Sequence, residues 1–135
     1  MKFFVALAAL VSSVAAITVS YDTTYDNGGQ SLDTVACSDG TDGLTTKGFS
    51  TFNSLPDFPY IGGSDSVAGW NSANCGSCWQ LTYNDKTITI LVIDHANEGF
   101  NLSEEAMNDL TDGQAEALGR VDAQATQVDA SQCGL

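Results

Sequence analysis

Alternating apolar and polar residues predict four β-strands in this chain. The four stretches are residues 17–25, 79–83, 86–94 and 120–128. Near the end of the third stretch, apolar side chains fall on both faces of the strand, which is typical of a central strand covered on each side. Its neighbours must wrap round it, so the pattern favours a small closed barrel over a sandwich of two sheets.

Two short helices are predicted late in the chain. The first covers residues 103–110, where Asn101 or Ser103 can cap the N-terminus and two glutamates complement the helix dipole. The second covers residues 114–118 and ends at Gly119. Together with the strands, these helices predict a mainly β fold that carries short helices.

The region between the first two predicted strands carries turn signals instead of a long alternation. Two Asp-Gly steps in residues 38–43 indicate a polar loop, and two prolines make residues 56–60 irregular. Residues 62–63, both glycine, predict a further turn, and residues 84–85, Asn-Asp, suit the tight loop of a hairpin. The first half of the chain is therefore expected to be rich in loops.

The N-terminal sequence is typical of a secretory signal peptide. Lys2 provides positive charge, residues 3–11 are continuously apolar, and small residues suited to signal peptidase follow. The alternative, a membrane anchor, would need about 20 apolar residues. We therefore predict a signal over residues 1–16 and one extracellular domain over residues 17–135.

The predicted domain is strongly acidic. Its seventeen acidic side chains face only three cations, Lys47, Lys86 and Arg120, which gives a net charge of −14. Such a surface repels nucleic acids and anionic lipid head groups, whereas an uncharged polysaccharide meets no such penalty. We therefore expect neither a nucleic-acid partner nor membrane insertion, although the charge also serves simply to keep an exported protein soluble.

The domain contains four cysteines, Cys37, Cys75, Cys78 and Cys133. An even number in a small exported chain indicates two disulfides, and the sequence by itself allows three pairings. A bridge between Cys75 and Cys78 would form a redox motif, which needs a helix at the first cysteine, but strand-like alternation begins at Cys78 instead. The single histidine, His95, does not lie at the spacing of a zinc site, so no metal is expected. We favour a distant partner for each of the two central cysteines.

Ten short motifs resemble the cerato-platanin family of small secreted fungal proteins, in the order and spacing of that family. The motifs are residues 19–22 (VSYD), 36–40 (ACSDG), 59–63 (PYIGG), 68–72 (AGWNS), 75–79 (CGSCW), 93–96 (IDHA), 99–101 (GFN), 106–110 (AMNDL), 119–121 (GRV) and 133–135 (CGL). They extend from residue 19 to residue 135, so the resemblance covers essentially the whole predicted domain.

This resemblance implies a six-stranded double-ψ β-barrel related to the first domain of expansins, with disulfides Cys37–Cys75 and Cys78–Cys133. It implies no established hydrolase activity, and we expect neither an enzyme nor a cofactor. Members of the family bind chitin-type N-acetylglucosamine oligomers, can loosen cellulose without cutting it, collect at air–water interfaces and are perceived by plants as elicitors. We therefore expect a secreted protein of the fungal cell wall, a monomer or weak dimer, that a plant cell-surface receptor perceives through exposed loops such as residues 38–43 and 51–60.

Asp94 is the main candidate for a carbohydrate-binding residue, because it matches the aspartate that the family shares with expansins. At a strand end beside a groove, its carboxylate would accept hydrogen bonds from sugar hydroxyls. The structural alternatives are that Asp94 caps a loop or pairs with Arg120. Asp22, Asn101 and Tyr21 complete the predicted binding set, and no catalytic residue is predicted.

Two other functions stay open at this point. If Asp22 and Asp94 stood at the separation found in glycosidases, the barrel would be a polysaccharide hydrolase or a lytic transglycosylase, whereas a single carboxylate cannot follow the usual two-carboxylate route. The second alternative is a surface-active structural protein in the manner of hydrophobins. Four cysteines instead of eight, and the high negative charge, argue against a close analogy with hydrophobins.

Trp70, Trp79 and Tyr60 have rings that can stack on sugars, although aromatic side chains in a small barrel belong more often to the core. His95 is expected to be structural, because no serine motif or second histidine supports a role as a base. Asn101 opens a glycosylation sequon, and a position facing a groove would hinder its modification.

Overall fold

The structure is a computed structural model that describes residues 16–135, so the predicted signal lies, apart from Ala16, outside the described residues. The strands are β1 (Ile17–Tyr21), β2 (Ile61–Ser64), β3 (Cys78–Tyr83), β4 (Lys86–His95), β5 (Phe100–Leu102) and β6 (Arg120–Val128). The helices are α1 (Glu104–Thr111) and α2 (Ala115–Leu118), with short 3₁₀ turns at Thr23–Asp26, Leu32–Thr34, Phe52–Ser54 and Ala130–Cys133. No helix in the described part of the chain is long and apolar enough to cross a membrane.

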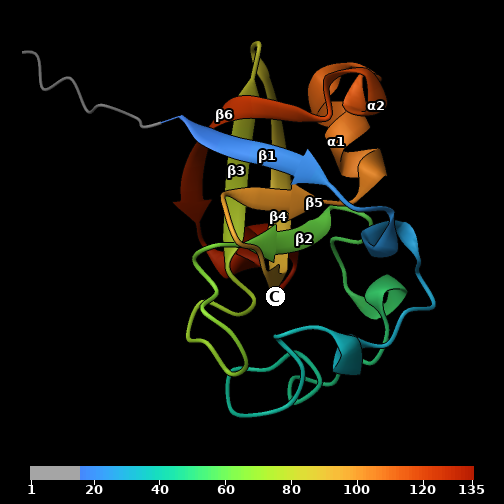
Figure 1. Cartoon of the computed structure of the whole chain (residues 1–135). Helices are drawn as coiled ribbons and strands as arrows, with labels where there is room; N and C mark the ends of the chain where they lie inside the picture. The colour runs from blue at the N-terminus through green and yellow to red at the C-terminus, as the bar shows by residue number, and fades with distance from the viewer. Residues whose placement is uncertain (1–15) are drawn as a thin grey trace, which may run out of the picture.

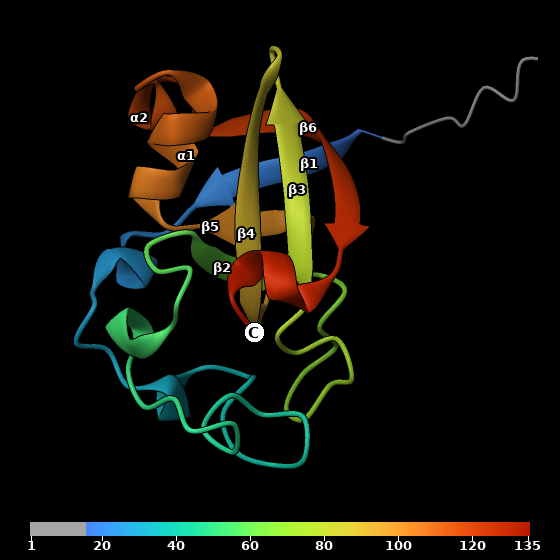
Figure 2. The ribbon, with the colours of Figure 1, turned by 180° about the vertical axis from the view of Figure 1, so that it is seen from behind.

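The six strands form a closed barrel in the order β1-β5-β2-β4-β3-β6. β1 pairs with β5 and β2 with β4 in parallel, whereas the other neighbouring strands are antiparallel. Figures 1 and 2 show the β3–β4 hairpin standing across β1, β5 and β2, with α1 and α2 beside the barrel. The predicted fold class, mainly β with short helices and a six-stranded double-ψ barrel, is confirmed.

β4 is the covered strand that the apolar pattern predicted. It lies between β2 and β3, and its residues from Ile90 to Ile93 are buried without a break. The loop that joins it to β3 consists of Asn84 and Asp85, whose φ angles are 45° and 64°. Left-handed backbone at both positions is what a two-residue hairpin loop requires, so the predicted hairpin is confirmed.

The predicted turn at residues 62–63 is wrong, because both glycines lie in β2. β5 pairs with β2 so closely that a Cβ atom on Gly62 would collide with the backbone of Asn101 and Leu102. Glycine occurs inside strands where another backbone approaches this closely. Glycine, which indicated a turn in the sequence, instead permits a tight contact between two strands.

Two strands differ from the predicted pattern, one in its length and one in its existence. β1 ends at Tyr21 instead of residue 25, because the Asp22 carboxylate accepts a hydrogen bond from Thr24 N at 2.9 Å and begins a 3₁₀ turn. β5 was not predicted, since its three residues are too few to show an alternation. Tertiary pairing with β1 and β2 makes it a strand.

Helix α1 has two caps at its N-terminus. Ser103 Oγ accepts a hydrogen bond from Ala106 N at 3.1 Å, as one of the two predicted caps. The Asp26 carboxylate, from the loop of residues 22–60 between β1 and β2 (called the early loop below), accepts hydrogen bonds from the N–H groups of Glu104 and Glu105 at 2.7 Å and 3.0 Å. Together they satisfy three of the N–H groups that a helix N-terminus leaves without internal partners, and they fix the early loop to α1.

Long loops occupy residues 22–60 and 65–77, and they gather at the lower end of the barrel in Figure 1. The disulfide Cys37–Cys75 joins these two loops, and Cys78–Cys133 joins the start of β3 to the C-terminal 3₁₀ turn. Both predicted pairings are confirmed, and all four cysteines are buried. The disulfides thus fix these loops covalently, in regions that lack the backbone hydrogen bonds of a β-sheet.

Asp57 is an ionisable group that folding places in an unfavourable environment. Its Oδ2 atom is buried without a hydrogen-bond partner in the described part of the chain. Burial raises the pKa of Asp57 to about 7, against a smaller opposing effect of the Leu91 backbone N–H. Between about pH 4 and 7 the folded protein therefore retains a proton on Asp57 that the unfolded chain has lost. Because the folded state binds more protons in this window, the contribution of Asp57 to the free energy of unfolding falls as the pH rises through it.

We expect Asp57→Asn to raise the free energy of unfolding at pH 7.5 by about 1–2 kcal/mol, since the neutral amide removes the cost of a buried charge. The full change in pKa would correspond to ~4 kcal/mol, but Asp57 is only part-buried and solvent screening reduces it. The gain should vanish near pH 4, where both side chains are neutral. Urea unfolding at pH 4, 5.5 and 7.5 measures it, with the exposed Asp33→Asn as control, and a gain independent of pH would contradict the explanation.

Candidate functional site

A polar hollow of about 430 Å³, called the barrel groove below, lies where β1, β5, β6 and the end of β4 meet. Its lining residues are Ser20, His95, Ala96, Asn97, Glu98, Asn101 and Arg120. Every lining side chain except that of Ala96 carries hydrogen-bonding atoms, which suits a ligand rich in hydroxyl groups. Of the four predicted carbohydrate-binding residues, Asn101 lines the barrel groove, and the other three do not.

Ser20 and Asn101 face each other because they are register partners in the parallel pair of β1 and β5. Ser20 Oγ donates to Asn101 Oδ1 at 3.0 Å, and the Asn101 amide nitrogen has no hydrogen-bond partner within residues 16–135. Two N–H donors are therefore available to a ligand. The ring of Tyr21 packs against the core instead. Alternation along β1 identifies Ser20 as the groove residue, because neighbouring side chains of a strand point to opposite faces.

Arg120 and Glu98 give the barrel groove one charge of each sign. Arg120 Nη1 donates to Thr18 Oγ1 at 2.9 Å, which orients the guanidinium and leaves further N–H groups for a ligand. His95 Nδ1 lies 2.6 Å from the Val67 carbonyl oxygen, to which it donates a hydrogen bond, and this contact ties the end of β4 to the loop after β2. The contact agrees with the structural role expected for His95.

Asp94 holds the early loop against the end of β4. Its Oδ1 accepts hydrogen bonds from Ala36 N at 3.0 Å and from His95 N at 2.8 Å, and its Oδ2 accepts one from the Tyr25 hydroxyl at 2.9 Å. The suggested pairing with Arg120 is wrong, and the alternative that Asp94 caps a loop describes these contacts. Three of the roughly four acceptor positions of the carboxylate are thus used inside the protein.

Tyr25 is close enough to Asp94 and Asp22 to sense both charges. Burial raises the pKa of its hydroxyl far above the usual value, and the charge of Asp94, the hydrogen bond to Asp94 and the charge of Asp22 raise it further. The phenol is therefore neutral and donates to Asp94. Asp22 itself is exposed and caps the turn that follows β1. These two carboxylates thus flank a buried tyrosine and do not face each other across the barrel groove.

Two of the three candidate stacking residues belong to the body of the barrel. Trp79 meets Phe100 edge to face, with 5.5 Å between the ring centroids. Tyr60 packs against the core, and its hydroxyl donates to Asp109 Oδ2 at 2.8 Å. Trp70, by contrast, exposes 62% of its surface. Of the three, Trp70 alone is exposed, whereas Tyr60 and Trp79 are half-buried.

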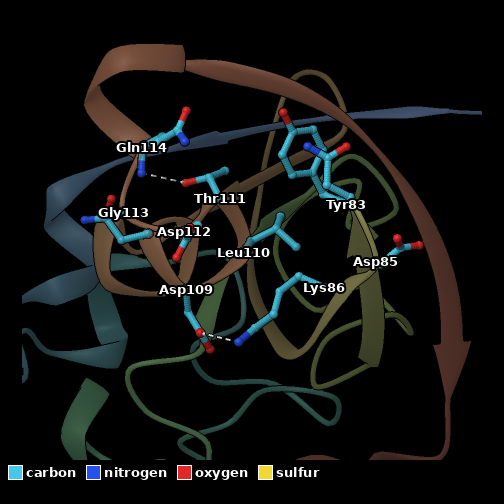
Figure 3. Close-up of a pocket in the computed structure, with 11 residues that line it drawn as sticks. Tyr83, Asp85, Lys86, Asp109, Leu110, Thr111, Asp112, Gly113 and Gln114 are labelled. Atoms are coloured by element: carbon cyan, nitrogen blue, oxygen red, sulfur yellow. Dashed lines mark hydrogen bonds and ion pairs between the residues drawn. The ribbon is translucent and has the colours of Figure 1, made fainter.

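A second hollow, of about 550 Å³, lies between the β3–β4 hairpin and the C-terminal end of α1, as Figure 3 shows. Lys86 Nζ lies 2.9 Å from Asp109 Oδ1, and this contact, followed by the hydrogen bond from Tyr60, holds the pKa of the Asp109 carboxyl below its usual value. The one cation of this hollow is therefore already paired. Within residues 16–135, no group of three or more His, Cys, Asp or Glu side chains is placed to hold a metal ion.

The sequence model of the Cerato-platanin family matches residues 17–135. A heat-stable 19 kDa antigen of Coccidioides immitis is 48% identical over 117 residues, which are 87% of this chain and 80% of the antigen. The crystal structure of cerato-platanin 3 from M. perniciosa superposes with a TM-score of 0.86 at 51% identity, covering 90% of this chain and all of that one.

The solution structure of the fungal elicitor Cerato-Platanin superposes with a TM-score of 0.76 at 38% identity. That comparison covers 87% of this chain and 96% of the elicitor. The names of these relatives describe an antigen, cerato-platanins and an elicitor, and none describes an enzyme. The family match over residues 17–135, together with the closed six-stranded barrel and its two disulfides, shows that this chain belongs to the cerato-platanin family.

Proposed function

We propose that this chain is a secreted, cell-wall-associated protein that binds chitin-type N-acetylglucosamine oligomers in the barrel groove without cutting them. The observation that carries the proposal is the unpartnered amide of Asn101, which lies beside Ser20 in a polar hollow that Arg120 also lines. Hydroxyl and acetamide oxygens of a sugar accept hydrogen bonds, and the amide and guanidinium groups donate them. The same donors would disturb hydrogen bonds between polysaccharide chains, including those of cellulose.

The charges of the protein favour an uncharged ligand. The domain carries seventeen acids and three cations, so polyanions are repelled before they reach the groove. Within the groove, Glu98 and Arg120 offset one another. A neutral glycan avoids this long-range repulsion and gains directional hydrogen bonds at short range.

The arrangement of carboxylates supports binding rather than hydrolysis. Glycosidases of the common type place two carboxyl groups on either side of the scissile bond. Glu98 is the one carboxylate among the described lining residues of the barrel groove, and Asp94 uses its oxygens on Ala36, His95 and Tyr25. A hydrolase or lytic transglycosylase based on Asp94 would need that carboxylate to leave its protein partners.

We extend the proposal to recognition by plants, since one structurally similar relative is a fungal elicitor. A cell-surface receptor would meet the loops of residues 38–43 and 51–60 through their exposed side chains, among them Asp39, Thr41 and Asn53. Elicitor activity in this view needs an exported, disulfide-linked protein and no catalysis. The barrel groove and the receptor-binding loops would then be separate surfaces.

We expect Asn101→Ala to weaken binding of chitohexaose about tenfold, because the variant removes two N–H donors from the groove. Titration of the ¹⁵N-labelled protein measures the effect through the backbone amide signals of residues 95–101. Gln127→Ala is the matched control, since it removes an exposed amide from β6 outside the groove. Cellohexaose in a parallel titration separates a preference for the acetamide group from binding of any β-linked chain.

Two outcomes would contradict the assignment of the groove. The first is that saturating chitohexaose leaves the signals of residues 95–101 in place. The second is that Asn101→Ala binds as tightly as the wild type. Release of reducing ends from chitin by the wild type would instead support the catalytic alternative.

A further inference from the structure

Trp70 is unusual among the large apolar side chains of this protein because its ring is exposed. It exposes 62% of its surface, and Leu118 at 40% is the only other large hydrophobic side chain exposed in residues 16–135. Leu118 ends α2, whereas Trp70 lies in the loop between β2 and β3. Trp70 is therefore a single exposed ring and does not belong to a broad apolar patch.

The indole of Trp70 is held in one orientation. Its Nε1–H donates to Asp39 Oδ1 at 2.6 Å, which ties the ring edge to the loop of residues 38–43. Gly40 lies against the same ring, because a Cβ atom added there would stand 3.1 Å from Trp70 Cζ2. The indole thus has a fixed edge and one supported side, with most of its surface open to solvent.

The two loops that carry this arrangement are fixed to each other. Asn71 Oδ1 accepts a hydrogen bond from Asp42 N at 2.9 Å, and Asn71 has a left-handed φ of 58°. The disulfide Cys37–Cys75 joins the same two loops. Little conformational entropy is left in the position of the ring, so a ligand that stacks on it has little more to lose.

The surroundings of Trp70 select the kind of ligand. Protein partners usually occupy contiguous apolar patches of several hundred Å², and a single ring with polar neighbours does not form one. Anionic ligands are disfavoured by Asp39 and Asp42, which lie in the loop that supports the ring, and by the net charge of the domain. A pyranose ring fits both conditions, because it has an apolar C–H face for the indole and neutral hydroxyl groups for the polar rim.

We propose that Trp70 is a second carbohydrate-binding site, a platform on which one pyranose ring of a neutral β-linked polysaccharide stacks. Asp39 and Gly40 are positioning residues that hold the indole for this contact. The class of ligand rests on the proposed function, whereas the platform rests on the geometry of Trp70 itself. On an insoluble polysaccharide, the platform and the barrel groove provide two points of attachment, so the loss of one weakens retention without abolishing it.

The test follows the side-chain N–H signal of Trp70 in the ¹⁵N-labelled protein during titration with chitohexaose and with cellohexaose. The two tryptophans give two indole signals, and Trp70→Phe identifies the signal of Trp70 by its loss. We expect a saturable shift of this signal. The comparison of the two oligomers shows whether chitin or cellulose provides the pyranose ring that stacks on the indole. In Asp39→Ala the indole signal of the free protein should move upfield, since its hydrogen bond is lost, and the sugar-induced shift should shrink.

Retention on insoluble chitin and cellulose provides a second measurement. Trp70→Ala should bind about fivefold more weakly, and Trp70→Phe should keep most of the affinity because it keeps an aromatic face. Leu118→Ala, which removes the other exposed apolar side chain, is the matched control and should bind as the wild type does.

The outcomes separate this proposal from the groove. An unmoved Trp70 signal at oligomer concentrations that saturate the signals of residues 95–101 would overturn the platform and leave the proposed function in place. A shift of the Trp70 signal with no response in residues 95–101 would support the platform and overturn the groove. A shift that follows protein concentration in the absence of sugar would show that a second copy of the chain covers the ring, which would also overturn the platform.

Discussion

Removing the disulfide between Cys37 and Cys75 is expected to lower the free energy of unfolding by about 4 kcal/mol. The bridge closes a loop with a sequence separation of 38 residues, and the chain-entropy relation for that length gives a cost of this size. The double variant Cys37→Ala/Cys75→Ala leaves no free thiol, as a single variant would, and adds no buried hydroxyl, as serine would. Because both cysteines are buried, two small cavities add to the loss.

Urea unfolding of this double variant measures the loss, and Cys78→Ala/Cys133→Ala is its counterpart. The second bridge has a separation of 55 residues, so the entropic cost of its removal differs by only a few tenths of a kcal/mol. The local consequences should differ more. Loss of Cys37–Cys75 should speed amide exchange in residues 38–45 and 69–77, whereas loss of Cys78–Cys133 should free chiefly the C-terminal 3₁₀ turn. A loss below about 1 kcal/mol for the first variant would show that loop contacts alone hold these segments.

Asp94→Ala is expected to lower the free energy of unfolding by about 2–4 kcal/mol, because it leaves three donors without their charged acceptor. The donors are the N–H groups of Ala36 and His95 and the hydroxyl of buried Tyr25. Asp94→Asn should cost less than half as much, since the amide oxygen still accepts the two backbone hydrogen bonds. Urea unfolding at pH 7 measures both variants.

The same two variants decide whether Asp94 also acts on carbohydrate. Below their unfolding transitions, both should bind chitohexaose as the wild type does, because Asp94 does not line the barrel groove. Asn101→Ala provides the reverse control, with weak binding expected from a stable protein. If Asp94→Asn kept its stability but lost binding of chitohexaose, Asp94 would contact the sugar directly, and its hydrogen bonds to the early loop would be secondary.

The residues that share the barrel groove are harder to predict than the fold, because the groove depends on contacts between distant segments. Ser20 and Asn101 are 81 residues apart in the chain and meet only through the parallel pairing of β1 and β5. Asp94 stands at the end of a strand, where a polar residue looks available for a ligand. The protein uses it instead for a loop that arrives from residues 25–36, and nothing in the local pattern around Asp94 indicates that loop.

The amino-acid sequence by itself determined the elements whose cause is local. Alternation and capping predict β3, β4 and β6, helices α1 and α2, and the hairpin at Asn84 and Asp85, since each depends on neighbouring residues. The tertiary structure alone decided that Gly62 lies in a strand, that three residues from Phe100 to Leu102 form another, and which polar side chains share the groove. Closing the barrel sets these features, because it brings the backbones of β2 and β5 into contact and selects which faces meet.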